Sequence, residues 1–502
     1  MLDGSGMISL DHYTEGSVFG GMISAREMAD LSKALRAGSD INNPGATSGG
    51  GFPLRVESLE AVLHSTTLSQ RDIVFWRDVP KMPAFNTVEE ANRLTSVGNE
   101  EGLFIGEGEL PEEDNSTYER IYTLIKYLGT LRRISHPMLV IKNALPEAIL
   151  QAEAKAGTLK ILRGLESKLF EGDATASGVE FDGFFRKFID GVAAVAASNA
   201  AGSTAWHGNL DTVLDTNLMQ DLRYDPMTED TASDMVTYAS DQPNHGEITD
   251  CYMPFNAYKD FSKQFYPKER GQLSSEGRAG TVVKSWLSPF GEVNLKPTKY
   301  VHRSSLAGQT GSGNVLRRPA VPVVNTATSP VLAGGLPGFG GTTQSRTAPA
   351  AIDGAGTYAY QIVAANKFGH SAPVDAAVAV TVGDMVTINV TDGSPAGTTE
   401  WYEVYRSLPG AAATTARFIF RMARSGATQD IIDFNRFLPG TSRMYWLQRN
   451  REAMAVKQLL PLLKVNLAQI DLTVRFALIL YLALEVYCPR KHSVAINVGP
   501  LV

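Results

Sequence analysis

The chain has 502 residues, of which 43% are hydrophobic and 20% are charged, and its formal net charge is −7. These proportions exclude disorder along the whole chain, and the length predicts two or three domains. The acidic total gives no indication of a sequence-reading nucleic-acid binder, although a local basic patch is compatible with it. The two cysteines, Cys251 and Cys488, could form at most one disulfide, which cannot stabilise a chain of this size. Its stability must therefore come from burial and assembly.

Residues 1–80 are predicted to form an extended arm with short helices. Ser24 and Glu27 make a capping-box pattern at the start of a helix over Ala25–Arg36. The Gly- and Pro-rich stretch 42–53 predicts a flexible loop. An arm of this kind buries little of its own apolar surface, so it needs another surface to lie on.

The sequence pattern predicts neither export through a signal peptide nor a membrane-spanning helix. The first residues have no basic start and no long apolar run, which a signal peptide would show. The most apolar stretch, Phe476–Cys488, is too short to cross a bilayer as a helix and contains Glu485.

Residues 81–135 are predicted to form a long two-stranded hairpin with an acidic tip. Asn99–Asp114 holds seven acidic residues and no basic one. The default interpretation is a solvated loop. A calcium loop is disfavoured because the required ligand alternation is missing. A third interpretation is a charged clamp that meets basic residues of a neighbouring subunit.

The clearest helix is predicted over residues 143–172. Pro146 suits its first turn and Gly172 its end. Apolar residues recur in steps of three and four from Leu145 to Leu169, and this spacing makes one continuous stripe.

Residues 181–318 are interpreted as a mixed α/β body. Asn209–Tyr224 has helical spacing, and two strands are predicted over Thr281–Leu287 and Glu292–His302 around a turn.

Composition shifts at Pro319, where charge falls and short β-rich runs begin, and this pattern predicts an all-β sandwich that ends near Gly440. Its predicted strands are Tyr358–Ala364, Ala377–Val382, Met385–Val390, Trp401–Arg406 and Arg417–Arg421. Farther on, Met454–Leu463 is interpreted as a helix broken by Pro461, and the alternation from Val474 to Tyr487 as a long strand.

No motif in the chain predicts catalytic, cofactor-binding or metal-binding residues, so no cofactor is expected. The glycine-rich Gly308–Gly313 lacks the lysine of a phosphate-binding loop and is interpreted as a linker. His245 and Glu247 offer two metal ligands without a clear third. Cys251 and Cys488 are predicted to be buried thiols that behave as small apolar residues.

The order of these elements resembles the major capsid proteins of tailed phages, the family named for phage Hong Kong 97. The segments that carry the resemblance are the arm (1–80), the extended loop (81–135), the spine helix (143–172), and a closing segment that includes Gln458–Leu463, Arg475–Tyr487 and Ala495–Val498. The resemblance implies an α+β fold with an N-terminal arm, an extended hairpin loop, a spine helix, and peripheral and axial domains.

Within the predicted sandwich, Tyr358–Pro373 resembles the late strand and turn of a fibronectin type III domain, and Glu403–Arg406 its central strand, in reversed order. An immunoglobulin-like sandwich insertion is therefore expected. Some capsid relatives cross-link a lysine to an asparagine with help from a glutamate. Lys126 and the glutamates of the loop are not selected by any motif, so no cross-link is predicted.

The expected division of the chain follows from both resemblances. Its parts are an arm (1–80), an extended loop hairpin (81–135), a spine helix with a peripheral and axial body (136–318), an immunoglobulin-like insertion (319–440), and a C-terminal return to the body (441–502).

The resemblance implies a major capsid protein that self-assembles into an icosahedral head shell around viral double-stranded DNA. The implied partners are copies of itself in hexamers and pentamers, neighbouring capsomers reached through arm and loop, portal, scaffold or decoration proteins, and packaged DNA contacted non-specifically on the inner face. No membrane partner is expected, and the expected location is the virion, after synthesis in the host cytoplasm.

Two alternatives stay open: an encapsulin-like shell around cargo protein, and an enzyme with a fibronectin-like accessory module. A secreted glycosidase, for example, needs two opposed carboxylates, which sequence alone does not exclude.

Overall fold

The computed structural model describes residues 73–98, 113–135, 148–196, 213–265, 283–301, 305–332, 338–394, 397–468 and 472–501, with single residues between them at 105, 107, 108, 110, 138 and 210. The predicted helix Ala25–Arg36, residues 1–72 of the arm and most of the acidic segment Asn99–Asp114 lie outside the described residues.

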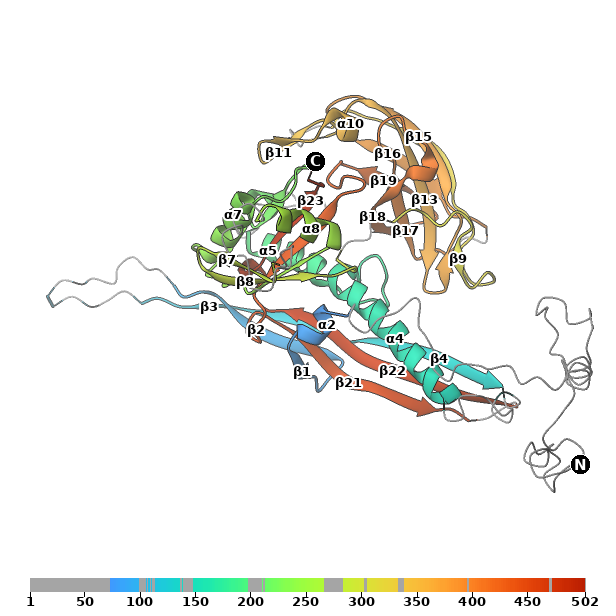
Figure 1. Ribbon diagram of the computed structural model, residues 1–502, viewed down its shortest axis with the longest axis horizontal. Helices are drawn as coiled ribbons and strands as arrows, with labels where there is room; N and C mark the ends of the chain where they lie inside the picture. Colours follow the sequence, from blue (N-terminus) through green and yellow to red (C-terminus); the bar gives the residue numbers. More distant parts are fainter. Residues whose placement is uncertain are drawn as a thin grey trace, which may run out of the picture. The chain divides into compact units, whose positions relative to one another are not determined.

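The α/β body is built on a six-stranded sheet with the strand order β5-β23-β20-β6-β8-β7. Its strands are β5 (Met219–Asp221), β6 (Asp250–Met253), β7 (Ser285–Ser288), β8 (Gly291–Pro297), β20 (Ser442–Leu447) and β23 (Ser493–Val498). Helices α5 (Phe184–Ala196), α7 (Glu229–Ser240) and α8 (Phe255–Lys263) belong to the same body (Figure 1). The strand pair predicted on either side of the turn at Ser288–Gly291 is confirmed as β7 and β8.

A second sheet has the order β1-β21-β22-β4 and carries the long helix α4 (Ala148–Glu171) against one face (Figure 1). Its strands are β1 (Lys81–Pro83), β4 (Lys126–Ser135), β21 (Met454–Asn466) and β22 (Thr473–Val486). A side chain at Gly157 would meet Leu478 at 2.6 Å, so this glycine permits the close approach of helix and sheet. The predicted long helix and the predicted terminal strand are confirmed as α4 and β22.

Residues 312–440, which we call the two-sheet unit, contain two antiparallel sheets, one with β18-β17-β13-β14-β9 and β15 beside β13, the other with β10-β16-β19. The strands are β9 (Ser312–Gly313), β10 (Val323–Thr328), β13 (Gly356–Asn366), β14 (Gly369–His370), β15 (Val374–Val380), β16 (Val386–Thr391), β17 (Trp401–Arg406), β18 (Arg417–Ala423) and β19 (Thr428–Asp433). Tyr360 of the first sheet donates to Asp433 of the second at 2.9 Å. All five predicted strands are present, but the immunoglobulin-like identity of this unit and its boundaries stay predictions.

The helix predicted over Met454–Leu463 is wrong. Met454–Leu463 is not a helix but part of β21, because this segment pairs with β22 on one side and with β1 on the other. Pro461 fits there because the pairing register shifts between Leu460 and Leu463, where no ladder hydrogen bond from the proline is needed.

The prediction of a helix over Asn209–Tyr224 is also wrong for the second half of that segment. The helical turn at residues 213–215 ends before Asn217, whose φ is +58°. Met219–Asp221 then pairs in parallel with β23 as strand β5.

The predicted single hairpin over 81–135 is divided between two sheets. Only β2 (Val88–Ser96) and β3 (Thr117–Leu124) form the antiparallel hairpin. The flanking strands β1 and β4 lie at opposite edges of the second sheet, where they pair with β21 and β22.

A buried carboxylate of α4 fixes the short helix α2 (Phe75–Asp78), which precedes β1. Glu166 accepts hydrogen bonds from the backbone N–H groups of Val74, Phe75 and Trp76 at 3.0, 2.7 and 2.8 Å. Burial raises the pKa of the Glu166 carboxyl, and the three N–H donors act against that rise. Glu166 therefore holds the start of the described chain against the long helix.

Replacing Glu166 by Ala should leave one buried and two part-buried N–H groups without this carboxylate partner, at a cost of about 3 kcal/mol. Hydrogen exchange at Val74–Trp76 should accelerate at least about a hundredfold, since about 1.4 kcal/mol corresponds to a factor of ten. The control is Glu153→Ala on the same helix, which removes only the partly exposed ion pair with Arg132 and should cost below about 1 kcal/mol. Equal protection in the wild type and Glu166→Ala would contradict the assignment.

Candidate assembly surface

One face of the β2–β3 hairpin is open to solvent and rich in apolar side chains. Tyr118 and Tyr122 are 70% and 72% exposed. They alternate along β3 with inward residues, and Leu94 lies opposite Tyr118 in the register. A single hairpin is marginally stable in water by itself. An aromatic face of this kind is therefore a candidate contact for another chain.

Cross-strand ion pairs hold the two strands of the hairpin in register. On the open face, Arg120 lies 3.2 Å from Glu90. On the other face, Arg93 lies 2.6 Å from Glu119. Exposed pairs contribute little free energy each but specify which residues stand opposite one another.

Charged groups also fasten the base of the hairpin to the body. The Lys187 ammonium of α5 donates to the Thr123 hydroxyl of β3 at 2.8 Å. Lys457 of β21 lies 3.7 Å from Glu89 of β2 and 3.9 Å from Glu485 of β22. Burial raises the pKa of the Glu485 carboxyl, and the two lysines oppose that rise. The hairpin therefore projects from a base held on both of its strands.

The face of the second sheet that lies away from α4 is a further exposed apolar surface. Tyr127 and Leu131 of β4 are 59% and 60% exposed. They stand opposite Tyr481 and Ala477 of β22, and the rings of Tyr127 and Tyr481 meet edge to face at 4.7 Å. α4 packs over the other parity of these strands, at Thr130 and Leu478.

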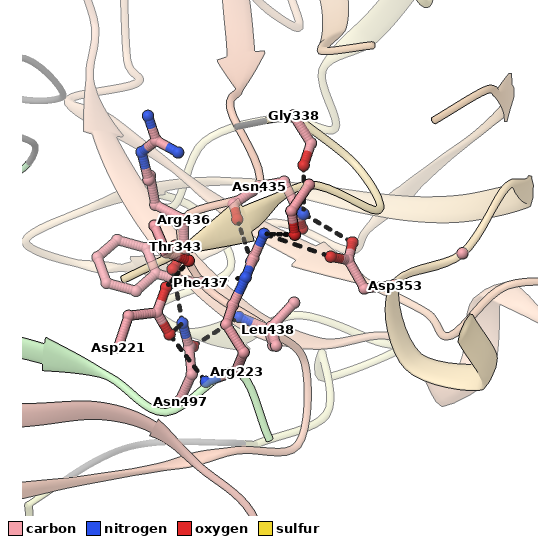
Figure 2. A network of polar contacts seen from close by, with 12 residues as sticks. Asp221, Arg223, Gly338, Thr343, Asp353, Asn435, Arg436, Phe437, Leu438 and Asn497 are labelled. Atoms are coloured by element: carbon pink, nitrogen blue, oxygen red, sulfur yellow. Dashed lines mark hydrogen bonds and ion pairs between the residues drawn. The ribbon is translucent and has the colours of Figure 1, made fainter. Parts of the chain in front are cut away.

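A buried polar network joins the α/β body to the two-sheet unit (Figure 2). Arg223, which follows β5, donates to the backbone oxygens of Asn435 and Gly341 at 3.0 and 3.2 Å. Its guanidinium also lies 3.4 Å from the Asp353 carboxylate. Asp353 in turn accepts from the Asn435 side chain at 2.6 Å. Burial raises the pKa of Asp353, although Arg223 and Arg406 oppose the rise.

A second branch of the network runs through Asp221 and Asn497. The Asn497 amide donates to Asp221 at 2.7 Å and to the backbone oxygen of Arg436 at 2.8 Å. Asp221 also accepts from the Thr343 hydroxyl at 2.9 Å. Figure 2 shows these side chains converging on one another from body strands and from the two-sheet unit. The union of the two parts is thus specified by hydrogen-bond geometry as well as by apolar contact.

Backbone strain is concentrated at the same place. Arg223, Asn435 and Asn497 have φ values of +47°, +60° and +55°. Asparagine tolerates the left-handed region better than most residues, whereas arginine does not. The hydrogen bonds of Arg223 compensate for its strained backbone.

The residues considered for chemistry at the sequence level do not come together. No group of three or more His, Cys, Asp or Glu side chains in the described part of the chain could hold a metal ion. His245 is exposed. Gly308–Gly313, interpreted as a linker, instead ends in strand β9, which pairs with β14.

The remaining single residues have structural surroundings. Cys251 is a buried thiol as predicted, whereas Cys488 is only half-buried because it follows the end of β22. The Lys126 ammonium donates to the backbone oxygen of Gly178 at 2.6 Å. Among the described residues, no helix is both long and apolar enough to cross a membrane.

No family model matches the chain, but curated relatives match almost all of it. It is 24% identical over 487 residues to the major capsid protein of Staphylococcus phage K, covering 93% of this chain and 95% of that protein. It is 23% identical over 486 residues to the major capsid protein of Staphylococcus phage S25-3, with the same coverage.

Solved structures with similar chains include the capsid of Myoviridae Phage XM1. The two chains are 10% identical, and the alignment covers 95% of this chain and 99% of that chain with a TM-score of 0.40. A second similar structure is the holo-SrpI encapsulin complex from Synechococcus elongatus PCC 7942, which is also 10% identical. The alignment covers 88% of this chain and 93% of that chain, with a TM-score of 0.34. Scores this low do not define a fold.

The predicted resemblance to phage major capsid proteins is confirmed by the curated relatives along nearly the whole chain. The predicted α+β class is confirmed, with the extended hairpin, the long helix and the terminal strand in the expected order.

The network predicts a strong effect of removing one member. Asp353→Ala should destabilise the protein by about 3 kcal/mol, because the Arg223 and Arg406 cations lose a buried carboxylate. Thermal unfolding followed by circular dichroism measures this loss. The exposed Asp430, which contacts the side chain of Asn389, supplies the control Asp430→Ala, with an expected change below about 0.5 kcal/mol. Similar melting curves for both variants would argue against the network.

A buried histidine predicts how stability depends on pH. His492 is fully buried and accepts from the backbone N–H of Gln448 at 3.1 Å. Burial, helped by the charge of Lys491, lowers the pKa of His492 to about 3.

Between pH ~6.5 and ~3 only the unfolded chain binds the proton of this histidine, so its contribution lowers stability as pH falls, by at most about 1.4 kcal/mol per pH unit. His492→Asn keeps a hydrogen-bond acceptor at this position and should remove this contribution to the pH dependence of the unfolding free energy, measured with urea. The control His245→Asn, at an exposed site, should keep that pH dependence. An unchanged slope in His492→Asn would refute the assignment.

Proposed function

We propose that this chain is the major capsid subunit of a tailed phage, and that its copies assemble into an icosahedral shell around double-stranded DNA. The observation that carries the proposal is the match over 93% of this chain and 95% of the phage K major capsid protein. A match of that extent is far longer than any single part of the fold. An accessory module shared with an otherwise unrelated enzyme would match over only part of the chain.

The exposed surfaces support self-assembly on physical grounds. The open hairpin face and the outer face of the second sheet both present aromatic and aliphatic side chains to water. Such patches are a liability for a monomer and are stabilised when another copy covers them. We propose that hexamers and pentamers form through these faces and that the arm and hairpin reach neighbouring capsomers.

The remaining parts of the proposal follow from this role. Portal, scaffold or decoration proteins would be further partners, the shell would be part of the virion, and synthesis would take place in the host cytoplasm. The role is structural, without catalysis. The predicted insertion, residues 319–440, includes most of the two-sheet unit and would lie outside the shell lattice.

Electron microscopy and light scattering of the purified protein test the proposal. Closed shells are expected, and shells filled with nucleic acid after phage infection would separate a phage capsid from a cargo-protein compartment. A protein that stays monomeric at high concentration, with no shells visible, would contradict it.

The hairpin face supplies a sharper test. The double variant Tyr118→Asp/Tyr122→Asp should fold normally, because both side chains are exposed. It should raise the concentration needed for assembly by about thirtyfold, which corresponds to about 2 kcal/mol of lost apolar burial. Leu316→Asp, at a site that is 95% exposed in the two-sheet unit, is the control and should assemble like the wild type. Sedimentation velocity measures the assembled fraction, and wild-type assembly of the double variant would exclude this face from the contact.

A further inference from the structure

A groove with an apolar floor lies beside the first half of α4. It has a volume of about 360 Å³ and is lined by Ile73, Arg77, Lys155, Thr158, Leu159 and Leu162. The floor consists of Ile73, Leu159 and Leu162. A cavity of ~150 Å³ holds a group the size of benzene, so this groove has room for two apolar side chains.

Cations border this floor along the outward face of α4, which carries the exposed Lys155, Lys160 and Arg163. Lys155 lines the groove itself, and Arg163 lies one helical turn after Leu159 of the floor. Arg77, which comes from α2, is two-thirds exposed. The groove therefore combines an apolar floor with a basic rim.

The carboxylates of α4 do not neutralise this rim. Glu166 accepts from the backbone of α2. Glu153 pairs with an arginine of β4, and Glu171 pairs with an arginine of β20. Lys155 and Arg163 form no ion pair with any other described residue. The rim can therefore bind carboxylates from outside the helix.

The chain itself contains a segment of matching chemistry, Asn99–Asp114, between β2 and β3. It holds seven acidic residues and no basic one. Among them stand the apolar residues Leu103, Phe104, Ile105 and Leu110. Ile105 is 51% exposed and Leu110 is 91% exposed, and the exposed Glu107 lies between them. Apolar side chains flanked by carboxylates are the complement of an apolar floor flanked by cations.

The geometry of the hairpin assigns this segment to a second copy. β4 begins next to the residues that follow α4, where Lys126 donates to Gly178 at 2.6 Å. Farther along β4, Arg132 pairs with Glu153 in the first half of α4. The hairpin therefore leaves the sheet near the end of α4, whereas the groove lies near its beginning. β2 and β3 then project away from α4 over about 30 Å (Figure 1).

We infer that the groove of α4 binds the acidic segment Asn99–Asp114 of a second copy, with Ile105 and Leu110 on the apolar floor and carboxylates facing Lys155 and Arg163. The inference rests on the proposed function and deepens it, because it names a contact by which the hairpin of one subunit holds the next. Segment and groove are different surfaces, so each subunit offers both, and such head-to-tail contacts can close into rings.

The apolar floor is the observation that favours a protein segment over a nucleic acid. A phosphate backbone would meet the cations of the rim, but it would leave Ile73, Leu159 and Leu162 without an apolar partner. The acidic segment supplies both kinds of contact. Burial of its apolar side chains would add to the attraction between charges, which salt screens at an exposed surface.

The test uses the full-length subunit, below the concentration at which it assembles, and a fluorescein-labelled peptide of residues 99–114. Binding is measured by fluorescence anisotropy. Lys155→Glu/Arg163→Glu should weaken binding at least about tenfold, because attraction to the carboxylates becomes repulsion. The control Lys284→Glu/Lys367→Glu reverses two exposed cations elsewhere and should change binding by less than about twofold. Equal loss in both variants, or loss in neither, overturns the inference.

A second peptide separates this contact from a general attraction for anions. Its four substitutions, which retain all seven acidic residues, are Leu103→Ser, Phe104→Ser, Ile105→Ser and Leu110→Ser. It should bind at least about tenfold more weakly, because its apolar burial is lost. Equal binding of the two peptides would make the groove a general anion site and overturn the inference. So would a short DNA duplex that displaces the original peptide as effectively as the unlabelled peptide does.

An exchange of charges tests the contact during assembly. Glu107→Lys/Glu109→Lys and Lys155→Glu/Arg163→Glu should each reduce shell formation, seen by electron microscopy. The variant that combines all four substitutions should recover it, because the attraction is restored with the signs reversed. Wild-type assembly of both double variants, or no recovery in the combined variant, contradicts the pairing.

Failure of the proposed function has a different signature. Peptide binding that depends on Lys155 and Arg163, in a protein that never forms shells, supports the contact and refutes the proposed function. Normal wild-type shells without any peptide binding overturn the inference alone.

Discussion

The contact between Arg223 and Asp353 is the constraint on which the arrangement of the described chain depends. Both side chains are buried, and a buried charge is tolerated only when a partner and further hydrogen bonds surround it. Arg223 comes from the body, whereas Asp353, Gly341 and Asn435 come from the two-sheet unit. Any other docking of these two parts would leave the buried Arg223 guanidinium without its partners. The two parts therefore meet in one geometry, and the unit is joined to the body more firmly than a flexible linker would allow.

The second sheet gives the outward-reaching hairpin a rigid base. β1 precedes the hairpin and β4 follows it, and these two strands occupy opposite edges of the sheet around β21 and β22. Because both ends of the hairpin are fixed to one sheet, β2 and β3 can project into solvent without fraying from the body. Lys187, Lys457 and Glu485 add polar contacts at the root of the projection. Glu166 secures the chain just before β1.

Different faces of the described chain differ in their chemistry. Tyr118 and Tyr122 on the hairpin, and Tyr127 and Leu131 on β4, are apolar and exposed, as suits a surface that another protein copy covers. The outward face of α4 is cationic and lacks exposed aromatic rings. Helix and sheet thus present unlike surfaces on the two sides of one layer, since α4 covers the sheet face opposite to Tyr127.

The sequence by itself determined the elements whose periodicity is local. The apolar stripe of α4, the alternation of β22 and the turn between β7 and β8 can all be read from consecutive residues, and the order of elements was enough to indicate a capsid protein. Tertiary structure decided the rest. Met454–Leu463 is an apolar run without clear alternation and became a strand only because β1 and β22 flank it. The strand β5 needs β23 beside it. Glu166 caps a segment 91 residues earlier, and Arg223 has no local pattern that points to Asp353. Such contacts depend on which distant segments the fold brings together, and neighbouring residues in the sequence do not encode that information.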